Sequence, residues 1–124
     1  MQDKKTVIMV IDDDPDFIAA MRPVLESAGY IMKEAESAEQ GLKVYKNINP
    51  DIILVDLMME EVDSGTNFVK ELKLLGNKAP VFLLSAAGDQ MAFLVDYAQL
   101  GFAGVFQKPV DHHRLLNVIK AKLK

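Results

Sequence analysis

Apolar runs of strand length alternate with amphipathic helical patterns along the whole chain, and this alternation restricts the fold more than any other feature of the sequence. The strand-like runs occupy residues 6–11, 30–35, 51–55, 80–84 and 101–107. Helical patterns begin near residues 15, 38, 66, 89 and 112, so that each follows one of these runs. Strict alternation of strands and helices predicts an α/β domain with a parallel sheet and helices on both of its faces.

The apolar content of the five runs predicts the order of the strands. Runs 6–11, 51–55 and 80–84 are almost wholly apolar, as in strands that are covered on both faces. Runs 30–35 and 101–107 contain polar residues or glycine and are expected at the edges. We therefore expect a doubly wound (βα)5 sandwich with a five-stranded parallel sheet of order 2-1-3-4-5. In such sheets ligands bind at the carboxyl ends of the strands, where the strand order reverses, here between the first and third strands.

The composition is that of an ordinary soluble globular chain, with 50% hydrophobic and 26% charged residues among 124. Its net charge of −4 argues against direct nucleic acid binding by this segment. No apolar run is long enough to cross a bilayer, and no signal segment opens the chain. Cysteine is absent, which fits a reducing compartment, so we expect one cytoplasmic domain that does not contact a membrane.

Side chains with distinct chemistry follow the strand-like runs at their carboxyl ends. Asp12 and Asp13 follow the first run, and Asp56 follows the third. Ser85 follows the fourth run and Lys108 the fifth. Because the carboxyl ends of parallel strands meet at one edge of a sheet, we expect these side chains to converge.

Several carboxylates at one edge repel one another unless a cation lies among them. Oxygen ligands without Cys or His favour a hard ion, so the sequence predicts Mg²⁺, or Mn²⁺ in its place. Helix capping is the alternative role for the acidic run, and we assign that role to Asp14, which precedes a proline at the first helical position. A carboxylate beside a metal, a hydroxyl and a lysine can attack phosphorus, which makes Asp56 the candidate nucleophile.

These residues resemble the motifs of the receiver domain of two-component response regulators. The resemblance covers essentially all of residues 1–124 and implies one flavodoxin-like receiver, or phosphoacceptor, domain. The features that carry it are the pair Asp12-Asp13 after an apolar strand, Asp56 after Ile-Ile-Leu-Val, Ser85-Ala86, Phe106 and Lys108-Pro109.

The resemblance implies a role for each matching residue. Asp56 would be the phosphoacceptor, and Lys108 and Ser85 would be the other catalytic side chains. The metal would be held by three carboxylates and one backbone carbonyl, those of Asp12, Asp13, Asp56 and Met58.

The resemblance also implies a switch and an unusual peptide bond. Ser85 would bond a phosphoryl oxygen after phosphorylation, and Phe106 would turn into the space that Ser85 vacates. Simple core filling is the alternative role for Phe106. The bond between Lys108 and Pro109 would be cis, a form that is accessible before proline.

The implied function is that of a phosphorylation-activated signalling switch. A sensor histidine kinase, a phosphotransfer protein or a small phosphodonor would supply the phosphoryl group. The chain would catalyse its own phosphorylation and dephosphorylation without being a conventional enzyme. The face of the fourth helix, fifth strand and fifth helix would then control an output domain or a partner. On the expected fourth helix, Phe93, Tyr97 and Leu100 form a second apolar stripe that suggests a contact surface, for example in a homodimer.

The loop after Asp56 departs from the family pattern. It lacks the usual proline, adds Glu60 and Glu61, and has its glycine, Gly65, one residue late. The departure keeps open an alternative, a pseudo-receiver that acts as a phosphorylation-independent interaction module. A phosphatase of the haloacid dehalogenase type would need an acid where Met58 stands. A nucleotide-binding domain would need a glycine-rich phosphate loop, which the sequence lacks.

Overall fold

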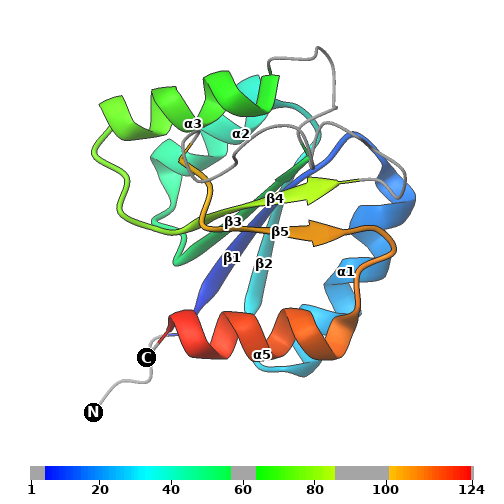
Figure 1. Cartoon of the computed structure of the whole chain (residues 1–124). Helices are drawn as coiled ribbons and strands as arrows, with labels where there is room; N and C mark the ends of the chain where they lie inside the picture. The colour runs from blue at the N-terminus through cyan, green and yellow to red at the C-terminus, as the bar shows by residue number, and fades with distance from the viewer. Residues whose placement is uncertain (1–4, 57–63, 86–100, 124) are drawn as a thin grey trace.

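The computed structural model of the chain describes residues 5–56, 64–85 and 101–123, with backbone alone at 64–67. Its centre is a five-stranded parallel sheet of order β2-β1-β3-β4-β5 (Figure 1). The expected strand order is confirmed, and the two runs that contain polar residues form the edge strands. The strands are β1 (Val7–Ile11), β2 (Ile31–Ala35), β3 (Ile52–Asp56), β4 (Val81–Ser85) and β5 (Gly104–Gln107).

Helices cover both faces of the sheet, so the doubly wound arrangement is also confirmed (Figure 1). On one face lie α1 (Pro15–Ser27) and α5 (His112–Lys122), and on the other lie α2 (Ala38–Asn47) and α3 (Ser64–Leu74). The helix expected over residues 89–100 lies outside the described residues. Among the helices of the described ranges, none has the length and apolar character that crossing a membrane requires.

Alternate residues of the central strands enter two separate hydrophobic clusters. In β1, Ile8 and Val10 pack in a cluster with buried residues of α1 and α5, whereas Met9 and Ile11 pack in a cluster with buried residues of α3. Successive side chains of a strand point to opposite faces, so a wholly apolar strand is buried on both sides. If a strand shifted its pairing by one residue, its side chains would exchange places between the two clusters. The burial of both faces therefore fixes the register of each strand and the residue at which it ends.

The helix α1 begins directly after the acidic run. Asp14 is its N-cap, as predicted, and the Asp14 side chain accepts a hydrogen bond of 2.9 Å from the amide of Asp16. Pro15 occupies the first helical position. At the other end, Ala28 is the C-cap of the helix and is exposed. Gly29 follows with a φ of +93°, the left-handed conformation that ends a helix.

The start of α2 resembles a capping box in which one of the two reciprocal hydrogen bonds is shifted by one residue. The Ser37 hydroxyl accepts a 3.1 Å hydrogen bond from the amide of Gln40, as expected of an N-cap. The Gln40 side chain, however, accepts its 2.6 Å hydrogen bond from the amide of Glu36 and not from that of Ser37. The Gln40 side chain thus satisfies the amide of the residue before the N-cap.

Each strand begins later than its predicted run, by one residue in β1 to β4 and by three residues in β5. Asp51 precedes β3, and its carboxylate accepts a 2.8 Å hydrogen bond from the amide of Val7 at the start of β1. The side chain therefore ties the ends of two neighbouring strands together. At β5, Gly101 has a φ of +99°, which an extended strand does not allow, and the strand begins only at Gly104.

Candidate functional site

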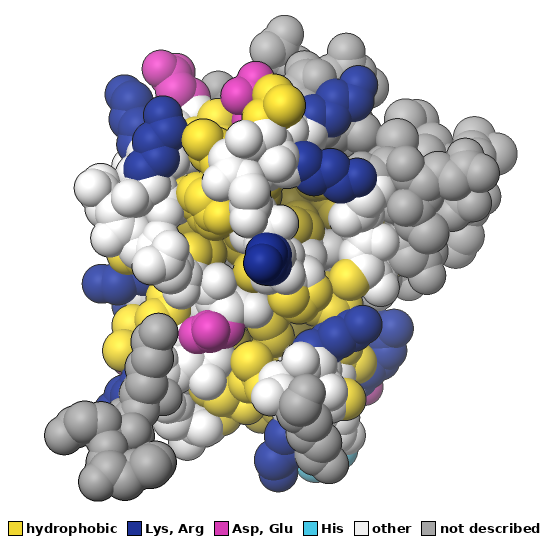
Figure 2. All heavy atoms as spheres, turned by 90° about the vertical axis from the view of Figure 1, so that its left-hand side faces the viewer, with side chains coloured by type: hydrophobic (Ala, Val, Ile, Leu, Met, Phe, Trp, Pro, Cys, Tyr) yellow, Lys and Arg dark blue, Asp and Glu magenta, His cyan; other side chains and the backbone are white. Residues whose placement is uncertain are grey.

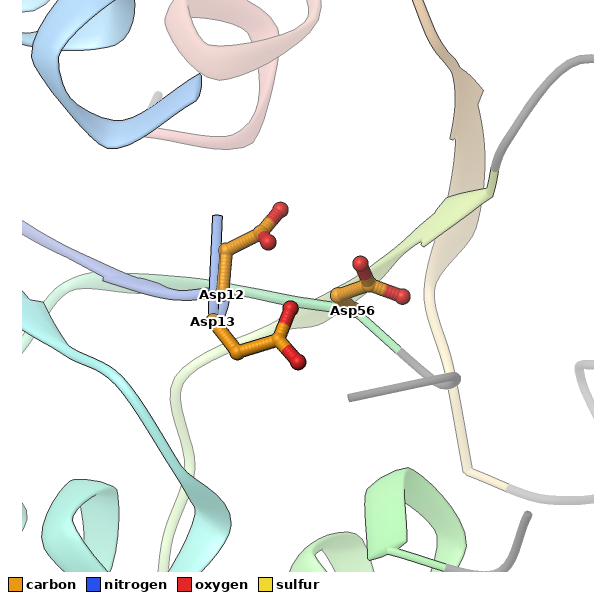
Figure 3. A group of neighbouring side chains, drawn as sticks. All are labelled: Asp12, Asp13 and Asp56. Carbon is orange, nitrogen blue, oxygen red and sulfur yellow. The ribbon is translucent and has the colours of Figure 1, made fainter. Parts of the chain in front are cut away.

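Three carboxylates meet at the carboxyl edge of the sheet (Figure 3). Asp12 and Asp13 follow β1, and Asp56 is the last residue of β3. Ile11 pairs with Val55 in the register of these two neighbouring strands, so the acids that come next stand side by side. One oxygen atom from each of the three carboxylates lies within 4.8 Å of those of the other two.

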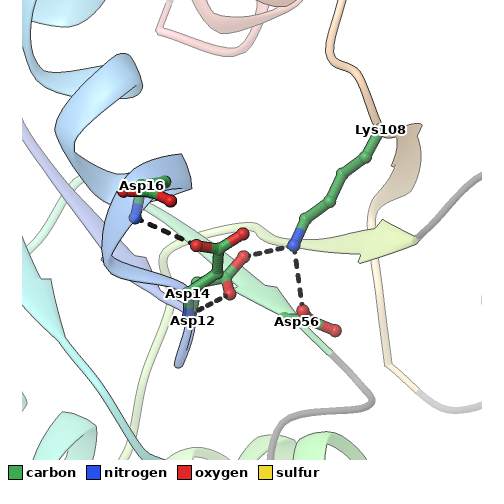
Figure 4. Close-up of polar contacts among 5 residues, drawn as sticks. All are labelled: Asp12, Asp14, Asp16, Asp56 and Lys108. Carbon is green, nitrogen blue, oxygen red and sulfur yellow. Dashed lines mark hydrogen bonds and ion pairs between the residues drawn. The ribbon is translucent and has the colours of Figure 1, made fainter.

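Lys108 reaches this cluster from the end of the edge strand β5, along the same carboxyl edge of the sheet (Figure 4). The residue follows β5, and its amide donates a 2.6 Å hydrogen bond to the carbonyl of Ser85 at the end of β4. The Lys108 Nζ atom donates to Asp12 Oδ2 at 2.5 Å and to Asp56 Oδ2 at 3.0 Å. One ammonium group thus bridges carboxylates from β1 and β3, and the convergence expected at this edge is present.

Asp12 is held by two hydrogen bonds to its carboxylate and one from its backbone amide. It is fully buried, and its Oδ1 accepts a 2.9 Å hydrogen bond from the amide of Asp14, while Oδ2 accepts from Lys108. The Asp12 amide donates to the carbonyl of Ala35 at the end of β2, at 3.0 Å. Burial raises the pKa of the Asp12 carboxyl above its usual value, although the two hydrogen bonds oppose this shift. The ion pair with Lys108 therefore compensates for a costly buried charge.

The charge of Lys108 depends on the same contacts. Burial lowers the pKa of its ammonium group, but the hydrogen bonds to Asp12 and Asp56, with the charges of these residues, outweigh burial and leave the pKa above its usual value. The ammonium group is therefore charged at neutral pH. One positive charge faces three carboxylates, so the cluster keeps an excess of negative charge.

Ser85 and Phe106 stand at the ends of the neighbouring strands β4 and β5, but their side chains point to opposite faces of the sheet. Ser85 pairs with Gln107 and Leu84 pairs with Phe106 in the strand register. Both Ser85 and Phe106 are buried. The Phe106 ring lies 5.3 Å from the ring of Phe82, centroid to centroid, and so forms part of the core that faces α1 and α5.

Two residues for which the sequence analysis predicts no role contact members of the site. The ring centroid of Phe17 in α1 lies 4.4 Å from Lys108 Nζ, and the guanidinium carbon of Arg114 in α5 lies 5.1 Å from the ring centroid of Phe106. For Phe17 the sequence does hold a signal, because a helix that starts beside the acidic run places its first turn at the same edge.

Other predicted residues divide between described and undescribed parts of the chain. The Lys108–Pro109 peptide bond is cis. Met58, with its expected carbonyl ligand, lies outside the described residues, and so do Phe93, Tyr97 and Leu100 of the expected contact surface.

The donor set of the cluster fits a divalent magnesium ion. All three acids offer carboxylate oxygen, the ligand type that Mg²⁺ prefers, and no sulfur or imidazole ligand lies among them. Asp12 is buried, whereas Asp13 is exposed and leaves the cluster open to water. An ion that keeps several of its waters matches such a half-open site.

Fold and site together define a class: a doubly wound α/β domain with an acidic cluster and a lysine at the carboxyl edge of its sheet. The family model described as "Response regulator receiver domain" matches residues 8–120. The chain therefore belongs to this family and is a receiver domain of a two-component response regulator.

Individual relatives agree with this assignment. Chemotaxis protein CheY of Bacillus subtilis is 30% identical over 117 residues, which are 94% of this chain and 96% of that protein. Transcriptional regulatory protein GlrR of Escherichia coli is 32% identical over all 124 residues, but these correspond to only 28% of its own length. Among solved structures, CheY4 of Vibrio cholerae has a TM-score of 0.82 at 21% identity, covering 96% of this chain and 99% of that one, and supports the fold alone.

Proposed function

We propose that this receiver domain is a phosphorylation-activated switch in which Asp56 accepts the phosphoryl group. The observation that carries the proposal is the position of Lys108 Nζ, which contacts both Asp12 and Asp56 within the carboxylate cluster. A carboxylate oxygen whose negative charge is offset on one side, and which is partly open to water, has what a phosphoryl acceptor needs. The proposed receiver domain comprises residues 1–124.

The proposed reaction transfers a phosphoryl group from the donor to a carboxylate oxygen of Asp56. An Asp56 carboxylate oxygen attacks the phosphorus of the donor in line, and the bond from phosphorus to the donor's leaving atom breaks with its electron pair. Asp56 becomes an acyl phosphate, and Lys108 pairs with a phosphoryl oxygen. Asp12, Asp13 and Asp56, with the Met58 carbonyl, would hold Mg²⁺, whose chemical contribution when bound is to offset charge on the phosphoryl oxygens. Dephosphorylation is attack by water on the same phosphorus, which returns the Asp56 carboxylate.

The same site offers a route from the phosphoryl group to the surface. Ser85 ends the strand next to β3, and we assign its hydroxyl a hydrogen bond to a phosphoryl oxygen. The ring of Phe106 on β5 lies on the opposite face of the sheet from Ser85, so the proposed change in its position would be passed on through the backbones of β4 and β5. The output face is then β5, α5 and the fourth helix, which would bind an output domain, a partner or a second copy of the chain.

The proposed partners follow from this reaction. The donor is a sensor histidine kinase, a phosphotransfer protein or a small phosphodonor, and the proposed location is the cytoplasm, where such donors are available. We assign the chain no direct binding to nucleic acid or membrane, in line with its net charge of −4.

The test is phosphorylation by acetyl phosphate in the presence of Mg²⁺. Mass spectrometry of the intact protein should show the added mass of one phosphoryl group, and fragmentation should place it on Asp56. The Asp56→Asn variant should gain no such mass, whereas Asp51→Asn, an acid at the opposite edge of the sheet, should be labelled like the wild type. Label on another residue contradicts the proposal. Absence of both labelling and Mg²⁺-dependent beryllofluoride binding favours the pseudo-receiver instead.

A further inference from the structure

The Lys108 ammonium group has a third neighbour besides its two carboxylates. It lies 4.4 Å from the centroid of the Phe17 ring, within the range of a cation–π contact. The Lys108 side chain is 19% exposed, so the contact is largely shielded from water. A ring face attracts the ammonium charge without taking one of its hydrogen bonds, so Phe17 does not compete with the carboxylates.

The position of Phe17 is fixed by the start of α1. The N-cap Asp14 accepts hydrogen bonds from two amides of the first turn, through its side chain from Asp16 and through its carbonyl from Ile18. Phe17 lies between these two residues and is half-buried against the core cluster that faces α1 and α5. The first turn of α1 follows directly on the segment that carries Asp12 and Asp14 (Figure 4). The Phe17 ring is therefore anchored to the same chain segment as Asp12.

We propose that Phe17 is a positioning residue that holds the Lys108 ammonium group at the acidic cluster while its oxygen partners change. The inference rests on the proposed function, in which Lys108 leaves the free Asp56 carboxylate and pairs with a phosphoryl oxygen. The contact of Lys108 with Asp56 depends on whether Asp56 is phosphorylated, whereas the ring contact does not. Phe17 thus keeps the ammonium group close to the reacting oxygens before, during and after transfer.

The contact itself can be tested without any phosphorylation. Protons of the Lys108 side chain next to Nζ lie over the ring and should resonate upfield of those of the other lysines in NMR spectra of the unmodified protein. The upfield shift should disappear in Phe17→Leu, which keeps an apolar side chain, and persist in Phe17→Tyr, which keeps a ring. Unshifted Lys108 protons in the wild type would overturn the proposal even if the leucine variant does not fold.

The effect on the reaction is measured by the rate of phosphorylation at fixed acetyl phosphate and Mg²⁺. Phe17→Leu should be slower by about fivefold, and Phe17→Tyr should stay close to the wild type. The matched control is Tyr30→Leu, because Tyr30 is also a half-buried aromatic residue against the same core cluster. Equal rates for wild type and Phe17→Leu, or equal losses for Phe17→Leu and Tyr30→Leu, overturn the positioning role. If the wild type is not labelled at all, the proposed function fails, and the NMR comparison still decides whether Phe17 holds Lys108.

Discussion

Lys108 and Asp12 are 96 residues apart in the sequence, yet the ammonium nitrogen of one lies 2.5 Å from a carboxylate oxygen of the other. The Asp12 side chain has no exposed surface, whereas that of Lys108 keeps 19%. When its partner is removed, the buried Asp12 carboxylate is therefore the member of the pair that cannot be solvated by water.

Replacing Lys108 by methionine should destabilise the fold. Asp12 would lose its charge partner, and the three carboxylates would face one another without an ammonium group. We expect a loss of about 1–3 kcal/mol in the free energy of unfolding, measured by urea denaturation in the absence of divalent metal. The control is Lys43→Met, because Lys43 is exposed and lies 3.9 Å from an equally exposed Glu39, so that variant should be nearly neutral. Equal losses in both variants would contradict this account.

Removing the exposed charge of the cluster should have the opposite effect on the metal-free protein. Asp13→Asn relieves repulsion among the three carboxylates, and the Tm without metal should rise by about 3 °C. The same change removes a proposed ligand, so the Mg²⁺ affinity measured by titration should fall at least about tenfold. Asp16→Asn serves as the control, since Asp16 is exposed in the first turn of α1 and lies outside the cluster. An unchanged Mg²⁺ affinity in Asp13→Asn would exclude Asp13 as a ligand.

The cap of α1 should contribute measurably to stability. Asp14→Ala removes the side chain that accepts from the Asp16 amide and should cost about 1 kcal/mol of unfolding free energy. Asp14→Ser, which restores a capping oxygen, should recover most of the loss. A serine variant as unstable as the alanine variant would show that Asp14 acts by its charge and not as a cap.

Stability should also depend on the protonation of Lys108 in the alkaline range. Burial lowers the pKa of this group, but the bonds to Asp12 and Asp56 outweigh it, so the pKa in the folded state exceeds the ordinary value of 10.5. Folding therefore favours the protonated form, and its stabilising contribution is complete below pH 10.5 and is lost as the pH rises through the folded-state pKa. The stability difference between wild type and Lys108→Met, measured by urea unfolding, should shrink as the pH rises above 10.5. A difference that stays constant over this range would show that the pair stabilises by packing and not by charge.

Gly41 should resist substitution although it lies within a helix. A Cβ atom at this position would lie 2.7 Å from Ile11 Cδ1 and 3.3 Å from the Phe68 ring, so α2 packs directly against the sheet here. Gly41→Ala should cost about 1–2 kcal/mol in unfolding free energy despite the better helix propensity of alanine. Lys46→Ala, at an exposed position of α2, is the control and should change stability little. A more stable Gly41→Ala variant would show that the core adapts to the added methyl group.

The sequence predicts the fold well because its signals are local and periodic. Wholly apolar runs distinguish the inner strands from the edge strands, and Asp14 before Pro15 indicates the start of α1. The sequence also predicts that the side chains of Asp12, Asp56 and Lys108 converge at the carboxyl edge of the sheet. Each of these residues ends a strand or comes directly after one, and the order of the strands is predicted.

Other features depend on contacts between distant segments and carry no local signal. The pairing of Lys108 with Asp12 depends on how far a side chain reaches across β4 and β3. From the sequence, Gly41 is only a residue of low helix propensity, and nothing in the sequence indicates that the Ile11 side chain packs against it. Asp51 looks like a strand residue until its carboxylate is seen to bond to Val7. In each case the missing information is a distance between elements, which periodicity does not contain.

The bridge between Asp12 and Lys108 also sets an order of events during synthesis on the ribosome. The acids of the cluster are all translated in the first half of the chain, and their ammonium partner is added near the end, at residue 108 of 124. The carboxylates of a nascent chain therefore lack this ammonium group until β5 and Lys108 have been made. The site gains its lysine only when almost every residue of the domain has been made, so a prematurely terminated product cannot assemble it.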